Sequence, residues 1–137
     1  MIVDTSALYG FFDAKDKHHE TLVKLLTDCN EPLVVSPFVI AELDYLVMTR
    51  MGVTAELAVL NQLCGGAWDI QPVLMDDLRR ATNIVTDYAD DSIGITDAVN
   101  ISLAERCGTT TIATLDRRHV AVLRHVGGTV LNIVPAA

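Results

Sequence analysis

Basic residues are scarce in this sequence. Lys and Arg together number 10 against 18 Asp and Glu, the net charge is -8 at pH 7, and no lysine follows Lys24. Nonspecific binding to nucleic acid relies on clustered Lys and Arg that neutralise phosphates, so the composition argues against a broad nucleic-acid-binding surface. Local contact stays open, because two arginine pairs occur, at 79–80 and 117–118. We interpret them as solvated surface, although arginine also binds phosphate well.

Cysteine is scarce too. The three cysteines, Cys29, Cys64 and Cys107, are odd in number and show no C-x-x-C spacing, which argues against a disulfide framework or a zinc site. We expect all three in the core of a protein from a reducing, cytoplasmic compartment. No apolar run approaches the roughly 20 residues that span a bilayer, and no signal-peptide pattern begins the chain. The sequence therefore predicts a soluble protein without a membrane partner.

Linkers, repeats and low-complexity tracts are also missing. The chain has 137 residues, of which 50% are hydrophobic, and this length suits one domain with a sizeable core, spanning 1–137. Short β-rich runs alternate with longer helical ones, which predicts an α/β fold of three α/β/α layers around a central, mainly parallel sheet. The expected strands are 2–3, 33–36, 68–73, 109–114 and 129–134, and the expected helices are 17–29, 37–50, 54–64, about a dozen residues from 76, and 97–107.

Capping residues support several of these boundaries. Ser36 is an expected N-cap, with a proline in the first turn after it, and Asp16 and Thr96 are further expected N-caps. Gly108 stands where a C-terminal glycine ends a helix. Asp116 is expected to begin a short helix.

Two aspartates follow predicted strands. Asp4 comes directly after an apolar pair and Asp116 after the run T-T-T-I-A-T-L. In open α/β sheets the ligand crevice lies at the carboxyl ends of the strands, so both residues are candidates for a site. Asp97 lies in the first turn of its helix, where a carboxylate also simply favours the helix dipole.

Glu42 is the fourth candidate. Its neighbours three and four residues away on the predicted helix are all apolar, namely Phe38, Val39, Tyr45 and Leu46. A charge inside an apolar stripe should be protonated, paired or bound to a metal ion, because an isolated buried carboxylate is costly. The other interpretation is a partly exposed position at the edge of the stripe.

These acids have few cationic partners nearby in sequence, so a divalent metal ion is the economical way to hold them together. Ligation by oxygen alone suits Mg²⁺ or Mn²⁺ rather than Zn²⁺, and such ions commonly bind substrate phosphates. The sequence thus predicts phosphoryl chemistry in which the ion polarises a phosphate and activates water.

The four acids lie in segments that resemble the motifs of a PIN domain, and most of all a VapC-type toxin. The segments are I-V-D-T-S-A-L, I-A-E-L-D-Y-L, I-T-D-A-V-N-I-S-L-A-E and A-T-L-D-R-R-H. The resemblance covers essentially the whole chain. It implies an endoribonuclease that uses Mg²⁺ or Mn²⁺ to hydrolyse RNA and is held silent by a VapB-type antitoxin.

The resemblance also implies roles for single residues. Asp4 and Asp97 would be direct metal ligands, Asp116 would complete or water-bridge the site, and Glu42 would position a water or act as the base. Ser6 and Thr114 match hydroxyl positions beside the first and last acids, and Asp91 is an auxiliary ligand at most. Hydrolysis by this route needs no ribose 2′-hydroxyl. This route also fits the lack of a plausible pair of catalytic histidines. We expect His18 and His19 on the surface and His119 in local packing.

Other classes fit less well. A receiver-like signalling domain would need a lysine near the last strand and an acidic pair at the first strand, where this chain has Asp4 alone. A haloacid-dehalogenase-like phosphatase would need an acidic residue at position 6, which is Ser6 here. A non-catalytic α/β interaction module predicts the loss of one or more acids, and all four are present. We also expect a homodimer, since apolar residues gather near helix ends. They are Phe11, Phe12, Leu43, Met48, Met51 and Val53.

Overall fold

The computed structural model describes residues 1–118 and 130–136. Their strands form a five-stranded parallel sheet in the order β3-β2-β1-β4-β5. The expected parallel sheet is therefore confirmed, with β1 at its centre. The strands are β1 (Ile2–Val3), β2 (Val34–Val35), β3 (Asp69–Ile70), β4 (Thr111–Ala113) and β5 (Asn132–Val134).

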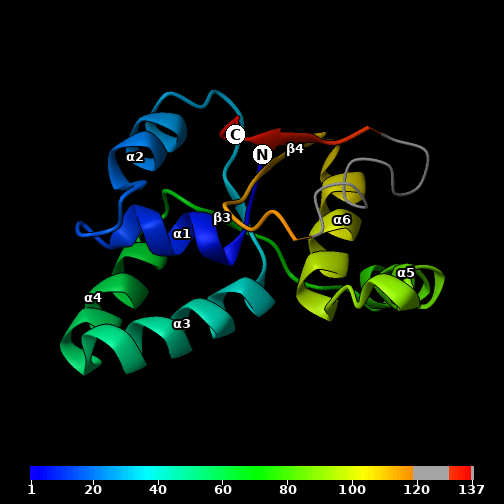
Figure 1. Cartoon of the computed structure of the whole chain (residues 1–137), viewed down its shortest axis with the longest axis horizontal. Helices are drawn as coiled ribbons and strands as arrows, with labels where there is room; N and C mark the ends of the chain where they lie inside the picture. Colours follow the sequence, from blue (N-terminus) through cyan, green and yellow to red (C-terminus); the bar gives the residue numbers. More distant parts are fainter. Residues whose placement is uncertain (119–129, 137) are drawn as a thin grey trace.

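Helices cover both faces of the sheet. Figure 1 shows α1 to α4 on one side of it and α5 with α6 on the other. Together with the sheet they make the predicted three layers. The helices are α1 (Thr5–Phe12), α2 (His19–Thr27), α3 (Pro37–Met51), α4 (Val53–Leu63), α5 (Met75–Asp87) and α6 (Ile95–Cys107), and a short 3₁₀ turn covers Ala89–Asp91.

Alternating strand residues build two separate cores. Ile2 packs into the core beneath α5 and α6, whereas the next residue, Val3, packs into the core beneath α1 to α4. Val34 and Val35 divide in the same way on β2. Successive side chains of a strand point to opposite faces, so even a two-residue strand anchors both layers.

Two of the predicted caps are confirmed. The Ser36 hydroxyl accepts a hydrogen bond from the Phe38 amide at 3.0 Å, and Pro37 begins α3. Gly108 ends α6 in the left-handed region with φ of 71°, which a residue without Cβ adopts freely. These local signals fix the helices that carry two of the candidate acids.

Other expectations were wrong in detail. Helix α6 begins earlier than predicted, because Gly94 rather than Thr96 is its N-cap. Cys64 and Cys107 are exposed and Cys29 is only partly buried, since the first two lie at helix ends that reach the surface. Residues 116–118 are not helical; the rest of the short helix expected there, including His119, lies outside the described residues.

The apolar residues expected at a dimer interface divide between core and surface. Leu43 is fully buried, and Phe11 and Phe12 pack against Trp68 with ring centroids 5.3 and 5.9 Å away. Met48, Met51 and Val53 remain exposed. The cluster is thus smaller than the sequence suggested, and the homodimer stays a prediction.

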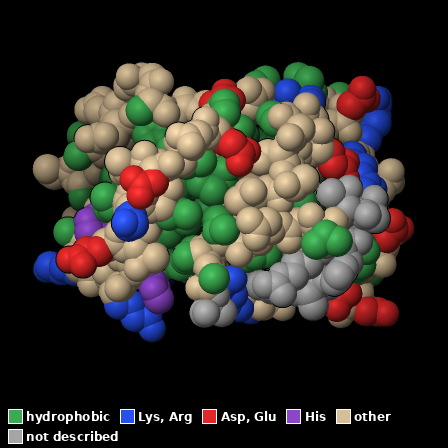
Figure 2. Space-filling view, turned by 90° about the horizontal axis from the view of Figure 1, so that it is seen from above, with side chains coloured by type: hydrophobic (Ala, Val, Ile, Leu, Met, Phe, Trp, Pro, Cys, Tyr) green, Lys and Arg blue, Asp and Glu red, His purple; other side chains and the backbone are tan. Residues whose placement is uncertain are grey.

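Figure 2 views the molecule from above, the side on which both termini lie in Figure 1. Hydrophobic side chains gather in an irregular area near the middle of this face, and acidic and basic side chains are scattered around it. Neither sign of charge dominates the visible face. Across 1–118 and 130–136, no helix is both long and apolar enough to cross a membrane.

Candidate active site

The four candidate acids line one cavity of about 700 Å³. Asp4 follows β1 and Asp116 lies just beyond β4, while Glu42 comes from α3 and Asp97 from the first turn of α6. The carboxyl ends of neighbouring parallel strands meet at one edge of the sheet, which is why residues so far apart in sequence come together. The structure therefore brings all four acids to the place where the strand ends predicted a site.

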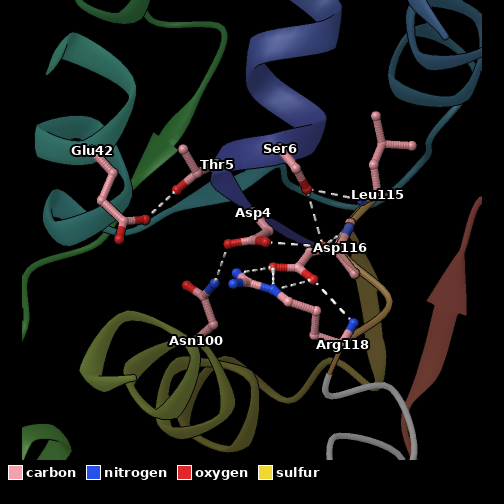
Figure 3. Close-up of polar contacts among 9 residues, drawn as sticks. Asp4, Thr5, Ser6, Glu42, Asn100, Leu115, Asp116 and Arg118 are labelled. Atoms are coloured by element: carbon pink, nitrogen blue, oxygen red, sulfur yellow. Dashed lines mark hydrogen bonds and ion pairs between the residues drawn. The ribbon is translucent and has the colours of Figure 1, made fainter. Parts of the chain in front are cut away.

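Asp4 is the most deeply placed of these acids, with 7% of its surface exposed. The Asn100 side-chain amide donates to one of its carboxylate oxygens at 3.1 Å (Figure 3). The Thr114 hydroxyl donates to the other oxygen at 2.9 Å. Burial raises the pKa of Asp4 above its ordinary value, hydrogen bonds oppose this, and the charges of Glu42 and Asp116 raise it further. The hydrogen bonds fix the carboxylate in place without neutralising it.

Two hydroxyl groups join the first and last acids. Thr114 uses its proton on Asp4, so Ser6 is the donor in the 3.1 Å bond between the two hydroxyls. The Asp116 amide donates to Thr114 Oγ1 at 3.1 Å, and the Leu115 amide donates to Ser6 Oγ at 2.9 Å. Ser6 and Thr114 thus lie beside the first and last acids and hold the turn after β4 against the start of α1; Figure 3 shows the contact between Ser6 and Leu115.

Asp97 has the clearest electrostatic signature. Burial, followed by the charges of Asp4, Asp116 and Glu42, raises its pKa to about 7, and Arg118 opposes the shift. The simple alternative for Asp97 was a carboxylate that favours a helix N-terminus. Such a role alone would not bring three other acids close enough to raise its pKa.

Glu42 is exposed rather than embedded in an apolar stripe. The buried face of α3 consists of Val39, Leu43 and Val47, and Glu42 lies outside it. The expected burial of Glu42 was therefore wrong, and the other interpretation, an exposed position at the edge of the apolar stripe, describes it better; Glu42 still lines the cavity. Thr5 Oγ1 donates to Glu42 Oε1 at 2.7 Å, which orients the carboxylate (Figure 3).

Asp116 contacts a basic residue of its own turn. Arg118 Nε donates to both carboxylate oxygens at 3.0 Å, its Nη2 forms an ion pair with the same group, and its backbone amide donates at 3.0 Å. Arg118 also lines the cavity. Figure 3 shows its guanidinium group beside the Asp116 carboxylate, in the space between Asp116 and Asn100.

The carboxylate oxygens of the four acids are ligands that a hard divalent ion prefers, but their side chains do not converge on one point. Within the described part of the chain, no group of three or more His, Cys, Asp and Glu residues could hold one ion as the side chains stand. Mg²⁺ usually keeps several waters and takes only one or two protein carboxylates, so this arrangement is compatible with it. A bound cation would also reduce the repulsion among these carboxylates, which contributes to the raised pKa values of Asp4 and Asp97.

One predicted residue lies apart, and three site residues were missed. Asp91 is exposed in the 3₁₀ turn and is absent from the cavity lining. Thr5 was not among the site residues predicted from the sequence. Asn100 is a buried polar side chain within the apolar run A-V-N-I, a signal of the kind that we sought around Glu42. Arg118 had been assigned to the surface.

Known proteins resemble this chain along nearly all of its length. The PIN domain family model matches residues 1–125. Ribonuclease VapC26 of Mycobacterium tuberculosis is 50% identical over 135 residues, which cover 98% of this chain and 100% of that protein.

Solved structures show the same fold. VapC20 of Mycobacterium tuberculosis, described as a toxin that cleaves the sarcin-ricin loop, superposes with a TM-score of 0.81 at 21% identity, over 88% of this chain and 93% of that one. VapBC2 of Rickettsia felis, solved bound to a promoter DNA fragment, gives a TM-score of 0.72 at 16% identity over 98% of each chain.

Proposed function

The chain belongs to the PIN-domain family and is a homologue of VapC ribonucleases, and from this premise we propose that it hydrolyses RNA with a divalent metal ion, Mg²⁺ or Mn²⁺. The observation that carries the proposal is the cavity lined by Asp4, Glu42, Asp97 and Asp116. The negative charges of the neighbouring acids raise the pKa values of Asp4 and Asp97, and such a cluster adds little to stability but suits a cation.

Asp4 and Asp97 would hold the ion, and Asp116 would complete the set. When bound, the ion supplies Lewis-acid polarisation of the scissile phosphate and lowers the pKa of the attacking water. Asn100 and Thr114 fix Asp4 by neutral hydrogen bonds, so its negative charge stays available to a cation. We treat Asp91 as no part of this set.

Glu42 would orient the attacking water and accept its proton. The Thr5 hydroxyl occupies one carboxylate oxygen of Glu42, and the side chain is exposed at the cavity. The phosphodiester would break by direct attack of water, without the ribose 2′-hydroxyl.

A VapB-type antitoxin is the proposed partner of this toxin. Support comes from solved relatives that are VapBC assemblies, and from apolar side chains exposed on α3 and α4, including Tyr45, Met48 and Leu57. We extend the proposal to a homodimer in the cytoplasm; the exposed free thiols of Cys64 and Cys107 suit a reducing compartment. Light scattering at tens of micromolar protein tests the dimer, and a monomer there contradicts it.

RNA cleavage with and without metal tests the function. Purified protein is incubated with cellular RNA in Mg²⁺, in Mn²⁺ and in EDTA, and the products are resolved on a gel. We expect discrete fragments with either ion and intact RNA in EDTA. Equal cleavage in EDTA would contradict the metal requirement, and intact RNA under all conditions would favour a non-catalytic module.

A further inference from the structure

Arg118 is a cation among carboxylates. Of the cavity-lining residues that the structure describes, it alone is basic, whereas four are acidic. Its side chain is 78% exposed, and that of its partner Asp116 is 27% exposed. A surface ion pair contributes little to stability, so folding alone gives no strong reason for this contact.

The pair ties up one of the acids that a metal ion would need. Both oxygens of Asp116 accept from Arg118 Nε at 3.0 Å, and Oδ1 also accepts from the Arg118 amide. This is consistent with the finding that no three acids within residues 1–118 and 130–136 are placed to hold an ion. A cation bound among these carboxylates would compete with the guanidinium group for Asp116.

The same cavity has to admit a polyanion. The protein carries a net charge of -8, and an RNA phosphate that approaches four carboxylates is repelled. Arginine presents a planar fork of N–H donors that matches phosphate oxygens, and it keeps its charge at any working pH. The Arg118 guanidinium group, exposed at the cavity, can therefore turn from a carboxylate to a phosphate by side-chain rotation.

We propose that Arg118 exchanges partners during the reaction cycle: it neutralises Asp116 in the metal-free protein, is displaced from it by the divalent ion, and then binds a backbone phosphate of the RNA. This inference rests on the proposed function and names the residue that admits substrate to the same site. Arg118 is thus a substrate-binding residue, and its ion pair with Asp116 is the resting state.

Two variants of adjacent arginines provide a matched test. Arg118→Gln removes the charge at the cavity. Arg117→Gln removes the same charge one residue away, where the Arg117 side chain donates instead to the Pro135 carbonyl. Both side chains are exposed, so we expect both variants to fold, which circular dichroism checks. Arg118→Lys keeps the charge without the fork.

Metal affinity is the first readout. Mn²⁺ is titrated into the metal-free full-length proteins by calorimetry. We expect Arg118→Gln to bind Mn²⁺ about 5-fold more tightly than the parent, because a competing and repelling charge is gone, and Arg117→Gln to bind within about 2-fold of it. Unchanged or weaker Mn²⁺ binding by Arg118→Gln would overturn the inference, because it would show that Arg118 does not compete with the ion for Asp116.

RNA affinity is the second readout. A fluorescein-labelled 20-nucleotide single-stranded RNA of mixed sequence is titrated in Ca²⁺, with gels to confirm that the probe stays intact. We expect Arg118→Gln to bind about 5-fold more weakly and to lower the slope of log affinity against log salt by about 0.7, the value for one lost phosphate contact. Arg118→Lys should recover most of the affinity.

These outcomes distinguish a failure of the proposed function from a failure of the proposed role of Arg118. A parent protein that binds neither Mn²⁺ nor RNA refutes the proposed function, and the inference with it. A parent that binds both, with Arg118→Gln and Arg117→Gln indistinguishable in either readout, refutes only the partner exchange of Arg118.

Discussion

Asp4 and Asp77 are almost equally buried, with 7% and 6% of their surfaces exposed, yet they have opposite surroundings. The Asp77 carboxylate accepts from Arg106 Nε at 3.0 and 3.1 Å and from the Leu74 amide at 2.9 Å, so a cation and a helix N-terminus both stabilise it. Among residues 1–118 and 130–136, the side chains that donate to Asp4 are both neutral, namely Asn100 and Thr114.

The neighbouring charges complete the contrast. Asp4 faces Glu42 and Asp116, which raise its pKa together with burial, whereas Asp77 joins α5 to α6 through a salt bridge. Burial therefore does not distinguish a site carboxylate from a structural one. The sign of the nearby charges differs, because Arg106 neutralises Asp77 within the fold, whereas Glu42 and Asp116 add negative charge beside Asp4, which we propose is balanced by a cation from outside.

The largest expected effect is on cleavage. Asp4→Asn or Asp97→Asn should reduce metal-dependent RNA cleavage by about 1,000-fold or more, the scale for losing one member of a catalytic set. The amide keeps the shape of the side chain and removes the charge that binds the ion. Single-turnover assays measure the rate, with Asp77→Asn as the control that should cut at the parent rate per folded molecule. Comparable losses in Asp77→Asn would erase the contrast.

Glu42→Gln should reduce cleavage by about 100-fold, the usual scale for a positioned acid–base group. The Thr5 hydroxyl can still donate to the glutamine carbonyl, so Mn²⁺ affinity and stability should stay near those of the parent. Cleavage rate and calorimetric Mn²⁺ binding are measured on one preparation, with Glu20→Gln on α2 as a matched exposed control. Full activity in Glu42→Gln would remove Glu42 from the catalytic set.

At Asp77 the expected effect is on stability rather than on cleavage. Asp77→Asn should lower the free energy of unfolding by about 2 to 3 kcal/mol, because it leaves a partly buried arginine without its carboxylate. The neighbouring Asp76→Asn breaks only an exposed pair with Arg79 and should change stability by less than about 0.5 kcal/mol. Urea unfolding measures both, and equal effects would contradict a structural role for Asp77.

A smaller effect follows from the pKa of Asp97, which is raised to about 7 in the folded protein. A group with a raised folded-state pKa binds its proton more tightly when folded, so metal-free stability should fall as pH rises from about 4 to 7. Without metal, Asp97→Asn should exceed the parent in unfolding free energy by about 1 to 2 kcal/mol at pH 8, a value reduced for solvent screening, and by little at pH 4.5. Urea unfolding at both pH values checks this, and a pH-independent difference would contradict it.

Much of the fold follows from local sequence signals. Ser36 and Pro37 mark the start of α3, and Gly108 marks the end of α6, because these residue types favour the backbone conformations of helix ends. Short apolar runs mark the strands. The start of α6 was missed because its N-cap is Gly94, which has no side chain to indicate a cap. The exposure of Cys64 and Cys107 could not be derived from residue type, because it depends on which helix ends reach the surface.

The site was only partly predictable. Asp4 and Asp116 follow from the rule about strand ends, which needs only the order of elements. Glu42 was selected by an argument about burial that the structure contradicts, since the apolar residues around it do not all face the core. The contact between Arg118 and Asp116 depends on a non-helical turn after β4, and no periodic pattern reports such a turn.

The central claim is that the fold leaves Asp4 and its neighbouring acids for a metal ion while it neutralises Asp77 internally. The most direct test is thermal unfolding of the parent, Asp4→Asn and Asp77→Asn, each with EDTA and with Mn²⁺ at about 100 times the parent dissociation constant, where binding adds about 2.7 kcal/mol. The account predicts that Mn²⁺ raises the melting temperature of the parent and of Asp77→Asn, and leaves that of Asp4→Asn nearly unchanged. Equal increases in the parent and Asp4→Asn, or no increase in any of the three proteins, would contradict it.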